Sequence, residues 1–118
     1  AVNNALKVVT KEDKRATSGL EGGGQMKQEF AKTAPLSLVY VGNMAKTKGM
    51  NYGGQEVGIP WTYTGAGAIA QNVYLFCASE GLACIIRAML DEVQVGKTLK
   101  LGPDQKVLLT QTIAQFKK

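Results

Sequence analysis

The residue types that perform most enzyme chemistry are few in this sequence of 118 residues. Histidine is absent, which removes the commonest metal ligand and general base and excludes Ser-His-Asp catalysis. The two cysteines, Cys77 and Cys84, lie within apolar runs, and two thiols alone are too few to hold a metal ion. We therefore predict no metal site and no catalytic side chain, and we expect both cysteines to be reduced and buried.

Two other stretches contain residue types that could bind a ligand. Gly22-Gly23-Gly24 could surround a phosphate, but no strand immediately precedes it and no Gly-Lys-Ser/Thr follows it, so a linker is the better interpretation. Residues 42–63 form a long segment rich in Gly, Lys, Asn and Tyr. Long loops of this kind often serve as lids or as the walls of binding sites.

The composition indicates one globular domain and argues against several classes of protein. Hydrophobic residues make up 45% and charged residues 19%, as in ordinary folded proteins. The net charge of +5 comes from scattered lysines and only 7% of residues are aromatic, so we expect no nucleic-acid binding. Gln71 and Asn72 interrupt the best candidate for a membrane span. We expect a cytoplasmic protein with no membrane contact.

The elements that must position these residues begin with a peripheral N-terminal part, residues 1–33. We predict an edge strand at 5–10, where β-prone residues precede a charged stretch. The glycine-rich loop follows, and then a short amphipathic helix at 25–33 that Pro35 stops.

Residues 34–118 are predicted to form the core of a single domain that spans 1–118. The run at 36–41 is apolar at nearly every position, which is typical of a central strand buried on both faces. Further elements are expected as strands at 82–86 and 106–113 and a helix at 89–99. Together these elements predict an α+β fold, a sandwich with a mixed sheet.

The longest predicted element is a helix that Thr64 caps and that runs to Glu80, with Gly81 at the position after its end where a left-handed conformation is needed. Its apolar residues go nearly all the way round, and a helix of that kind must be buried on every side. A domain this small cannot cover it alone. We therefore expect a central helix that forms an oligomer.

Three blocks of this sequence, in order, resemble the FMN-dependent nitroreductase family, in particular the small branch that includes SagB-type dehydrogenases. The first is APLSLVYV at 34–41, similar to the family's AP-x-x-L-V-Y-V strand, with Asp13-Lys14-Arg15 resembling an Asp-x-Arg element before it. The second and most specific, at 67–82, resembles the family's G-x-x-x-QN-x-x-L…A-x-x-GL helix. The third, at 101–112, is similar to its C-terminal strand.

The resemblance implies a nitroreductase-like sandwich and a homodimer with FMN at the subunit interface. The implied activity is hydride transfer from NAD(P)H through the flavin to a nitroaromatic compound, a quinone or a similar acceptor. The family's N-terminal arginine-rich segment has no counterpart here, so the N-terminal part of the fold is expected to be missing. Two alternatives stay open: a non-catalytic dimeric remnant or regulatory module, and one half of a split flavoprotein completed by a separate chain.

The resemblance also assigns cofactor-binding residues. Backbone groups of Ile86, Arg87 and Ala88 fall where the family contacts the isoalloxazine edge, and Ala88 stands where glycine is usual. Lys117 falls where the family places a cation on the FMN phosphate. For Arg87, a solvated strand end is the alternative interpretation.

Aromatic residues supply the candidate substrate site. Tyr52, Trp61 and Tyr63 lie on the segment that can wall the substrate channel in such folds, where flat rings could stack on a planar acceptor. Ordinary anchoring of the loop is an equally good interpretation of these side chains.

Overall fold

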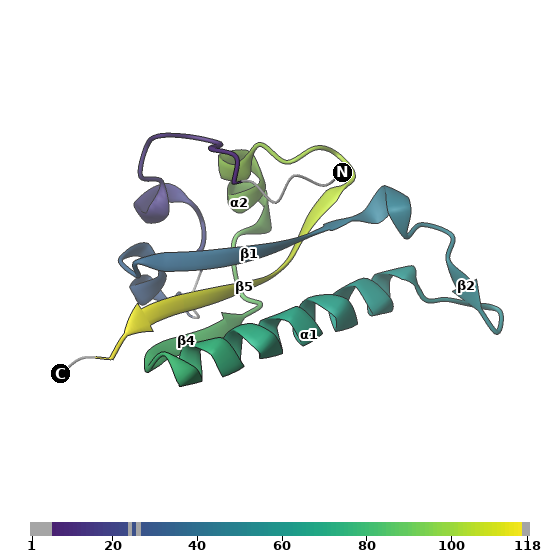
Figure 1. Ribbon diagram of the computed structural model, residues 1–118. Helices are drawn as coiled ribbons and strands as arrows, with labels where there is room; N and C mark the ends of the chain where they lie inside the picture. The colour runs from purple at the N-terminus through teal and green to yellow at the C-terminus, as the bar shows by residue number, and fades with distance from the viewer. Residues whose placement is uncertain (1–5, 24, 26, 117–118) are drawn as a thin grey trace.

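The computed structural model describes residues 6–23, 25 and 27–116, and these form an α+β domain around a three-stranded sheet (Figure 1). The strands are β1 (Leu36–Asn43), β4 (Leu82–Arg87) and β5 (Gln105–Gln115), in the order β1-β5-β4. Helix α1 (Gly58–Ser79) packs against β4 and β5 on one face, and α2 (Glu92–Leu99) lies on the other face. The smaller elements are η1 (Arg15–Thr17), η3 (Glu29–Lys32), η4 (Met44–Lys46), β2 (Asn51–Tyr52) and β3 (Gln55–Glu56).

The sheet is antiparallel throughout the described residues, so the prediction of a mixed sheet was wrong. Strands β1 and β4 run in the same direction, but β5 lies between them and runs opposite to both. No parallel pair therefore shares hydrogen bonds. The same order corrects the prediction that β1 is central: β5 has neighbours on both sides, whereas β1 pairs only with β5 and has no fully buried residue except Gly42.

Side chains of β5 pack on both faces of the sheet. The side chain of Gln111 points toward α1, where it meets the main chain of Ala70. Val107 points the other way, into a core cluster with Leu20, Ala31 and Val95. Leu20 and Ala31 come from the N-terminal part of the chain, so that part contributes to the core and is not only a peripheral attachment.

The N-terminal part differs from its prediction in local structure. Residues 6–10, the described portion of the predicted edge strand, form no strand and are exposed. The predicted helix at 25–33 is reduced to the 3-10 helix η3. Only Ala31 of η3 is buried, which is too small an apolar face to stabilise a longer helix.

Helix α1 begins six residues before the predicted cap, at Gly58. Pro60 lies in its first turn, where proline's fixed φ and missing N–H are tolerated. Thr64 is inside the helix and its hydroxyl donates to the Pro60 carbonyl at 2.9 Å, so it is not the cap. The predicted end is confirmed, because Gly81 follows with φ of +65°.

Helix α2, in contrast, starts later than predicted. Asp91 is its N-cap, and the Asp91 carboxylate accepts a hydrogen bond of 2.9 Å from the backbone N–H of Gln94. Residues 89 and 90 therefore belong to the connection between β4 and α2.

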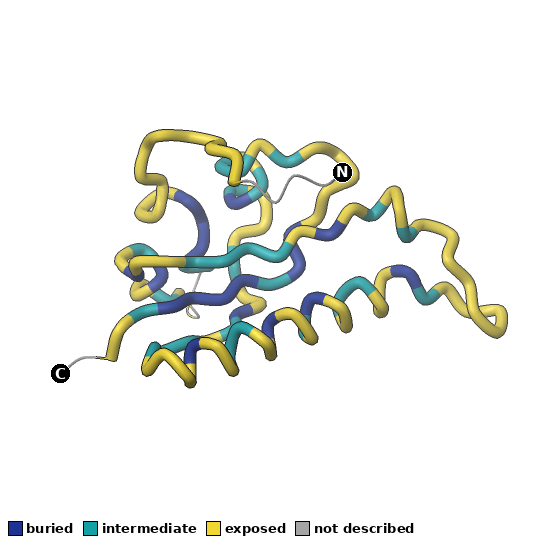
Figure 2. The backbone as a smooth tube through the Cα atoms, in the orientation of Figure 1, coloured by how far each residue is buried: buried dark blue, intermediate teal, exposed yellow. Residues whose placement is uncertain are grey.

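Only one side of α1 packs on the sheet, through small residues such as Ala66, Ala70 and Cys77. The opposite side carries large apolar residues that are exposed, as the alternation of colours along α1 shows (Figure 2). Ile69, Leu75 and Phe76 are 56%, 61% and 60% exposed. No helix in the described part of the chain is long and apolar enough to span a membrane.

Candidate functional site

The candidate cofactor site begins at the end of β4, where the backbone turns out of the sheet. The N–H of Ile86 points away from β5 and donates to the hydroxyl of Tyr74 on α1, at 2.6 Å. The carbonyl of Arg87 accepts from the hydroxyl of Thr110 at 3.4 Å. These two contacts hold the last residues of β4 between the helix and the central strand.

Three consecutive backbone donors follow this point. The N–H groups of Ala88, Met89 and Leu90 form no hydrogen bond with any described residue, and Ala88 and Met89 are exposed. The next amide is used, because the N–H of Asp91 donates to the carbonyl of Gly19 at 3.0 Å. The stretch from 88 to 90 therefore has backbone donors without a partner among the described residues, and a ligand with hydrogen-bond acceptors would satisfy such donors.

The side chain of Arg87 is buried and is only 4% exposed, so it is not a solvated strand end. Its guanidinium group donates to the carbonyl of Leu20, to the side-chain oxygen of Gln28 and, at 3.2 Å, to the hydroxyl of Thr112. It also lies over the ring of Phe30, 5.3 Å from the centroid. The guanidinium is thus occupied within the protein, and Arg87 can meet a ligand through its backbone.

Burial lowers the pKa of Arg87, and the nearby carboxylate of Glu21 partly offsets this. Glu21 itself is 3.6 Å from the ammonium of Lys32, and one of its carboxylate oxygens is buried without a hydrogen-bond partner among the described residues. The region behind β4 therefore holds a buried guanidinium with a half-buried carboxylate of opposite sign nearby.

The predicted cofactor residues are thus only partly brought together. Ile86, Arg87 and Ala88 are consecutive at the end of β4, with free donors directly after them. Lys117, the predicted phosphate ligand, lies outside the described residues. The donors of Met89 and Leu90 were missed, because an unused backbone N–H leaves no trace in a sequence.

Two of the three predicted substrate-binding aromatics are close together. The rings of Tyr52 and Trp61 have centroids 6.4 Å apart and planes inclined at 43°, and both side chains are exposed. Tyr63 is half-buried in α1 and does not belong to this pair. Trp61 was predicted to lie in a loop, but it lies in α1. Tyr52, on β2, is at the opposite end of the molecule from β4 (Figure 1).

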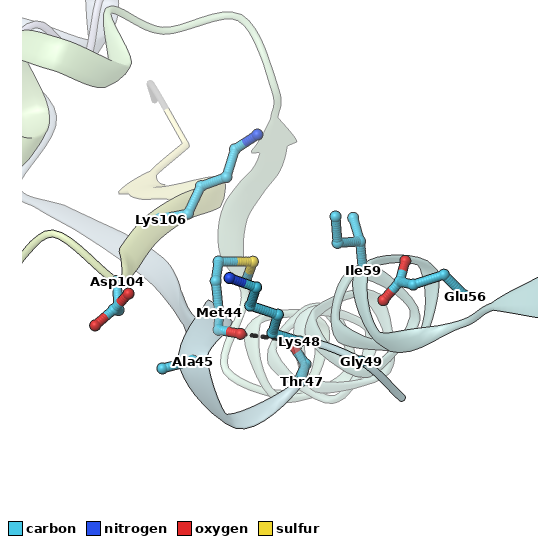
Figure 3. Close-up of a pocket in the computed structure, with 9 residues that line it drawn as sticks. All are labelled: Met44, Ala45, Thr47, Lys48, Gly49, Glu56, Ile59, Asp104 and Lys106. Carbon is cyan, nitrogen blue, oxygen red and sulfur yellow. Dashed lines mark hydrogen bonds between the residues drawn. The ribbon is translucent and has the colours of Figure 1, made fainter. Parts of the chain in front are cut away.

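A cleft of about 430 Å³ lies beside the start of α1 and the start of β5. Met44, Lys48 and Lys106 line one side, and Glu56 and Ile59 line the other (Figure 3). Four of these residues lie in the segment 42–63, which the sequence indicated as a possible lid or wall of a binding site, although none of them was named individually; Lys106, on β5, was not predicted to line a site. The cleft combines an apolar floor with charges of both signs, so its lining alone selects no class of ligand.

A buried polar cluster lies between the sheet and α1. Tyr40 donates to the side-chain oxygen of Gln111 at 2.5 Å, and the side-chain nitrogen of Gln111 is 3.0 Å from the sulfur of Cys84. Burial raises the pKa of the Cys84 thiol and that of the Tyr40 hydroxyl.

Cys77 is buried as predicted, whereas Cys84 is only half-buried, and both are free thiols. In the described residues, no three Cys, Asp or Glu side chains are grouped as metal ligands.

The fold and the strand end together define a class: an α+β domain with a long surface helix and a backbone donor site at the edge of an antiparallel sheet. The family model described as the nitroreductase family matches residues 2–114. The chain therefore belongs to the nitroreductase family. The search of curated proteins found no match.

Solved structures give the same result. A protein from Ralstonia eutropha JMP134 described as a nitroreductase is 33% identical, with a TM-score of 0.64, over 71% of this chain and 39% of that one. Nitroreductase family proteins from Clostridium novyi NT and Clostridium difficile 630 are similar in fold, with 20% and 15% identity and TM-scores of 0.67 and 0.61. They match 91% and 74% of this chain, and 58% and 48% of their own chains. The chain thus spans about 40 to 60% of these three proteins' length.

Proposed function

We propose that this chain carries the sheet and helix of an FMN-dependent NAD(P)H oxidoreductase of the nitroreductase type. The observation that supports this most directly is the run of free N–H groups at 88–90, in a chain that belongs to this family. The polar edge of an isoalloxazine ring carries oxygen and nitrogen acceptors, so the ring fits these donors. The chemistry that FMN supplies when bound is hydride transfer from NAD(P)H to an acceptor such as a nitroaromatic compound or a quinone.

The protein's contribution in this proposal is to bind and orient. The backbone of Ile86, Arg87 and Ala88 lies along the ring edge, and the hydroxyl of Tyr74 keeps the strand end in place from α1. Lys117 contributes a positive charge to the phosphate. No histidine is required, because the flavin itself accepts and releases the hydride.

The acceptor is proposed to contact Tyr52 and Trp61, which offer exposed, adjacent rings. The elements that carry these rings, β2 and the first turn of α1, lie at the opposite end of the molecule from β4 (Figure 1), so this part of the proposal depends on a second subunit. We propose that α1 packs against α1 of a second copy through Ile69, Leu75 and Phe76. Three large apolar side chains on one exposed helix face favour such a partner over water.

The test is the absorption spectrum of the purified chain after incubation with FMN, followed by an assay of NAD(P)H oxidation with a quinone. The proposal expects a retained flavin band and acceptor-dependent oxidation. Colourless protein that ignores added FMN would contradict it.

A non-catalytic remnant of the same fold is the second candidate. Ala88 favours it, because the residue stands at the proposed ring edge with a methyl group where the family usually has none. A dimer that forms without flavin and never binds it would support this candidate. If instead a separate chain completes the site, a partner of roughly 60 to 80 residues, enough for a few helices, should co-purify with this one.

A further inference from the structure

We propose that Arg87 is a positioning residue that fixes the direction of the free N–H groups at 88–90 by holding residues 19–22 against residues 89–91. The inference rests on the proposed function, because it concerns the same site. It adds a role for the side chain of Arg87, whereas the resemblance assigns only the backbone of this residue.

The side chain of Arg87 binds the N-terminal part of the chain. Two of its three hydrogen bonds go to that part, to the carbonyl of Leu20 and the side chain of Gln28, and the ring of Phe30 covers the guanidinium. The third bond, to Thr112, anchors the group on β5. Since the planar guanidinium offers several donors in a fixed geometry, one side chain joins the central strand to the segment that covers it.

The same segment contacts the connection after β4. Gly19 and Gly22 both have left-handed backbones, with φ of +82° and +75°. A Cβ on Gly22 would lie 2.9 Å from the carbonyl oxygen of Met89, and one on Gly19 would lie 3.1 Å from the Cβ of Asp91. The two backbones are therefore in direct contact, and the bond from the Asp91 N–H to the Gly19 carbonyl closes the contact.

These contacts hold the backbone on both sides of the three N–H groups of Ala88, Met89 and Leu90. They lie between two fixed points, Arg87 within the sheet and Asp91 bonded to Gly19. If residues 19–22 move away, Asp91 loses its acceptor and the connection is held at one end only. A donor array that is held before binding loses less freedom when the ligand arrives, so its affinity is higher.

The test compares Arg87→Lys with Arg15→Lys in the flavin-free protein, by amide hydrogen exchange. Lysine keeps the charge but cannot bridge three acceptors. We expect the Asp91 amide to exchange about tenfold faster in Arg87→Lys, the effect of one lost hydrogen bond, while amides of β5 change less. Arg15→Lys is the matched control, because Arg15 is exposed and its side chain bonds to Asp13 and the Ala34 carbonyl and not to residues 19–22 or 89–91, so it should leave Asp91 unchanged.

Binding of FMN gives the second readout. We expect Arg87→Lys to weaken FMN binding by about tenfold and to shift the absorption band of the bound flavin, whereas Arg15→Lys does neither. If Arg87→Lys does not fold, Gly22→Ala replaces it, because its new methyl must displace the Met89 carbonyl. Equal exchange at Asp91 in the wild type and the variant would overturn the inference. Wild-type protein that binds no FMN would overturn the proposed function, while the exchange at Asp91 would still decide the role of Arg87.

Discussion

The side-chain nitrogen of Gln111 donates a hydrogen bond of 3.1 Å to the main-chain oxygen of Ala70, and this bond joins the central strand β5 to helix α1. Gln111 is fully buried, and its side-chain oxygen accepts from the hydroxyl of Tyr40 on the neighbouring strand β1. One side chain therefore links both strands to the helix. It fixes where α1, the proposed dimer surface, sits on the sheet.

Replacing this residue should be costly. We expect Gln111→Leu to lower the free energy of unfolding by about 1–3 kcal/mol, because it removes the acceptor of the half-buried Tyr40 hydroxyl and the bond that ties the Ala70 carbonyl to β5. Gln115→Leu, on the same strand but exposed, should change the free energy by less than about 0.5 kcal/mol. Urea unfolding followed by circular dichroism measures both. Equal effects of the two substitutions would show that the buried network contributes nothing.

The sequence allowed the existence of most elements to be predicted, because the apolar runs that became β1, β4, β5 and α1 are long and distinct. It did not allow the order of the strands to be predicted. Residues 36–43 and 105–115 pair across more than half of the chain, and no local pattern records that pairing. The start of α1 was missed although Pro60 is a helix-start signal, because the glycines around it favoured a loop.

The candidate site likewise depends on tertiary contacts that no local sequence pattern records. The position of Ile86, Arg87 and Ala88 at a strand end follows from the order of residues. The burial of Arg87 does not, because its acceptors are 25, 59 and 67 residues away along the chain. The distance between Tyr52 and β4 also depends on tertiary structure, which separates residues that a family pattern groups together.

Glycine at position 58 is required by close packing. A Cβ there would lie 2.1 Å from the Thr47 carbonyl oxygen, so Gly58→Ala must move the backbone at the start of α1. We expect a loss of about 1–3 kcal/mol in the free energy of unfolding. Gly96→Ala is the matched control, since beyond its chain neighbours and the nearby backbone of its own helix no described atom lies within 4 Å of its new methyl group. It lies inside α2 and should gain roughly 0.5–1 kcal/mol, as glycine is a poor helix former. A Gly58→Ala protein as stable as the wild type would contradict this packing.

Asp13 should titrate at unusually low pH. Hydrogen bonds from the Arg15 side chain and from the Arg15 backbone N–H lower the pKa of Asp13 from 3.8 to about 2. The folded-state pKa is lowered, so any stability from this pair is present above pH 3.8 and is lost as the pH falls toward about 2. We expect the carboxyl carbon signal of Asp13 in NMR to titrate near pH 2 in the wild type and closer to 3.8 in Arg15→Ala. A wild-type midpoint near 3.8 would show that the two side chains do not interact in solution.

The thiol of Cys84 should make the fold sensitive to alkali. Burial is the main cause that raises its pKa above 9.0, so the folded state favours the protonated thiol. The resulting stability is present below pH 9.0 and is lost as the pH rises through the folded-state pKa. We expect Cys84→Ala to lose stability less steeply than the wild type above pH 9.0, in urea unfolding at a series of pH values. Identical pH profiles would contradict the prediction.

The dimer proposal predicts that a charge on the exposed face of α1 separates the subunits. We expect Phe76→Lys to convert a dimer into a monomer in light scattering, because the ammonium group would be buried in an apolar interface. Val93→Lys is the control, since Val93 is equally apolar, 69% exposed and located on α2. A wild-type chain that is monomeric at all concentrations, or a Phe76→Lys dimer, would remove the support for pairing through α1.

The central claim, a flavin site at the end of β4, is tested most directly by adding FMN to the isotopically labelled chain and following the backbone amide signals. The account predicts saturable shifts of the Ala88, Met89 and Leu90 amides, together with a change in the flavin absorption band. Signals at 88–90 that do not move while FMN is present in excess, or shifts confined to other parts of the chain, would contradict it.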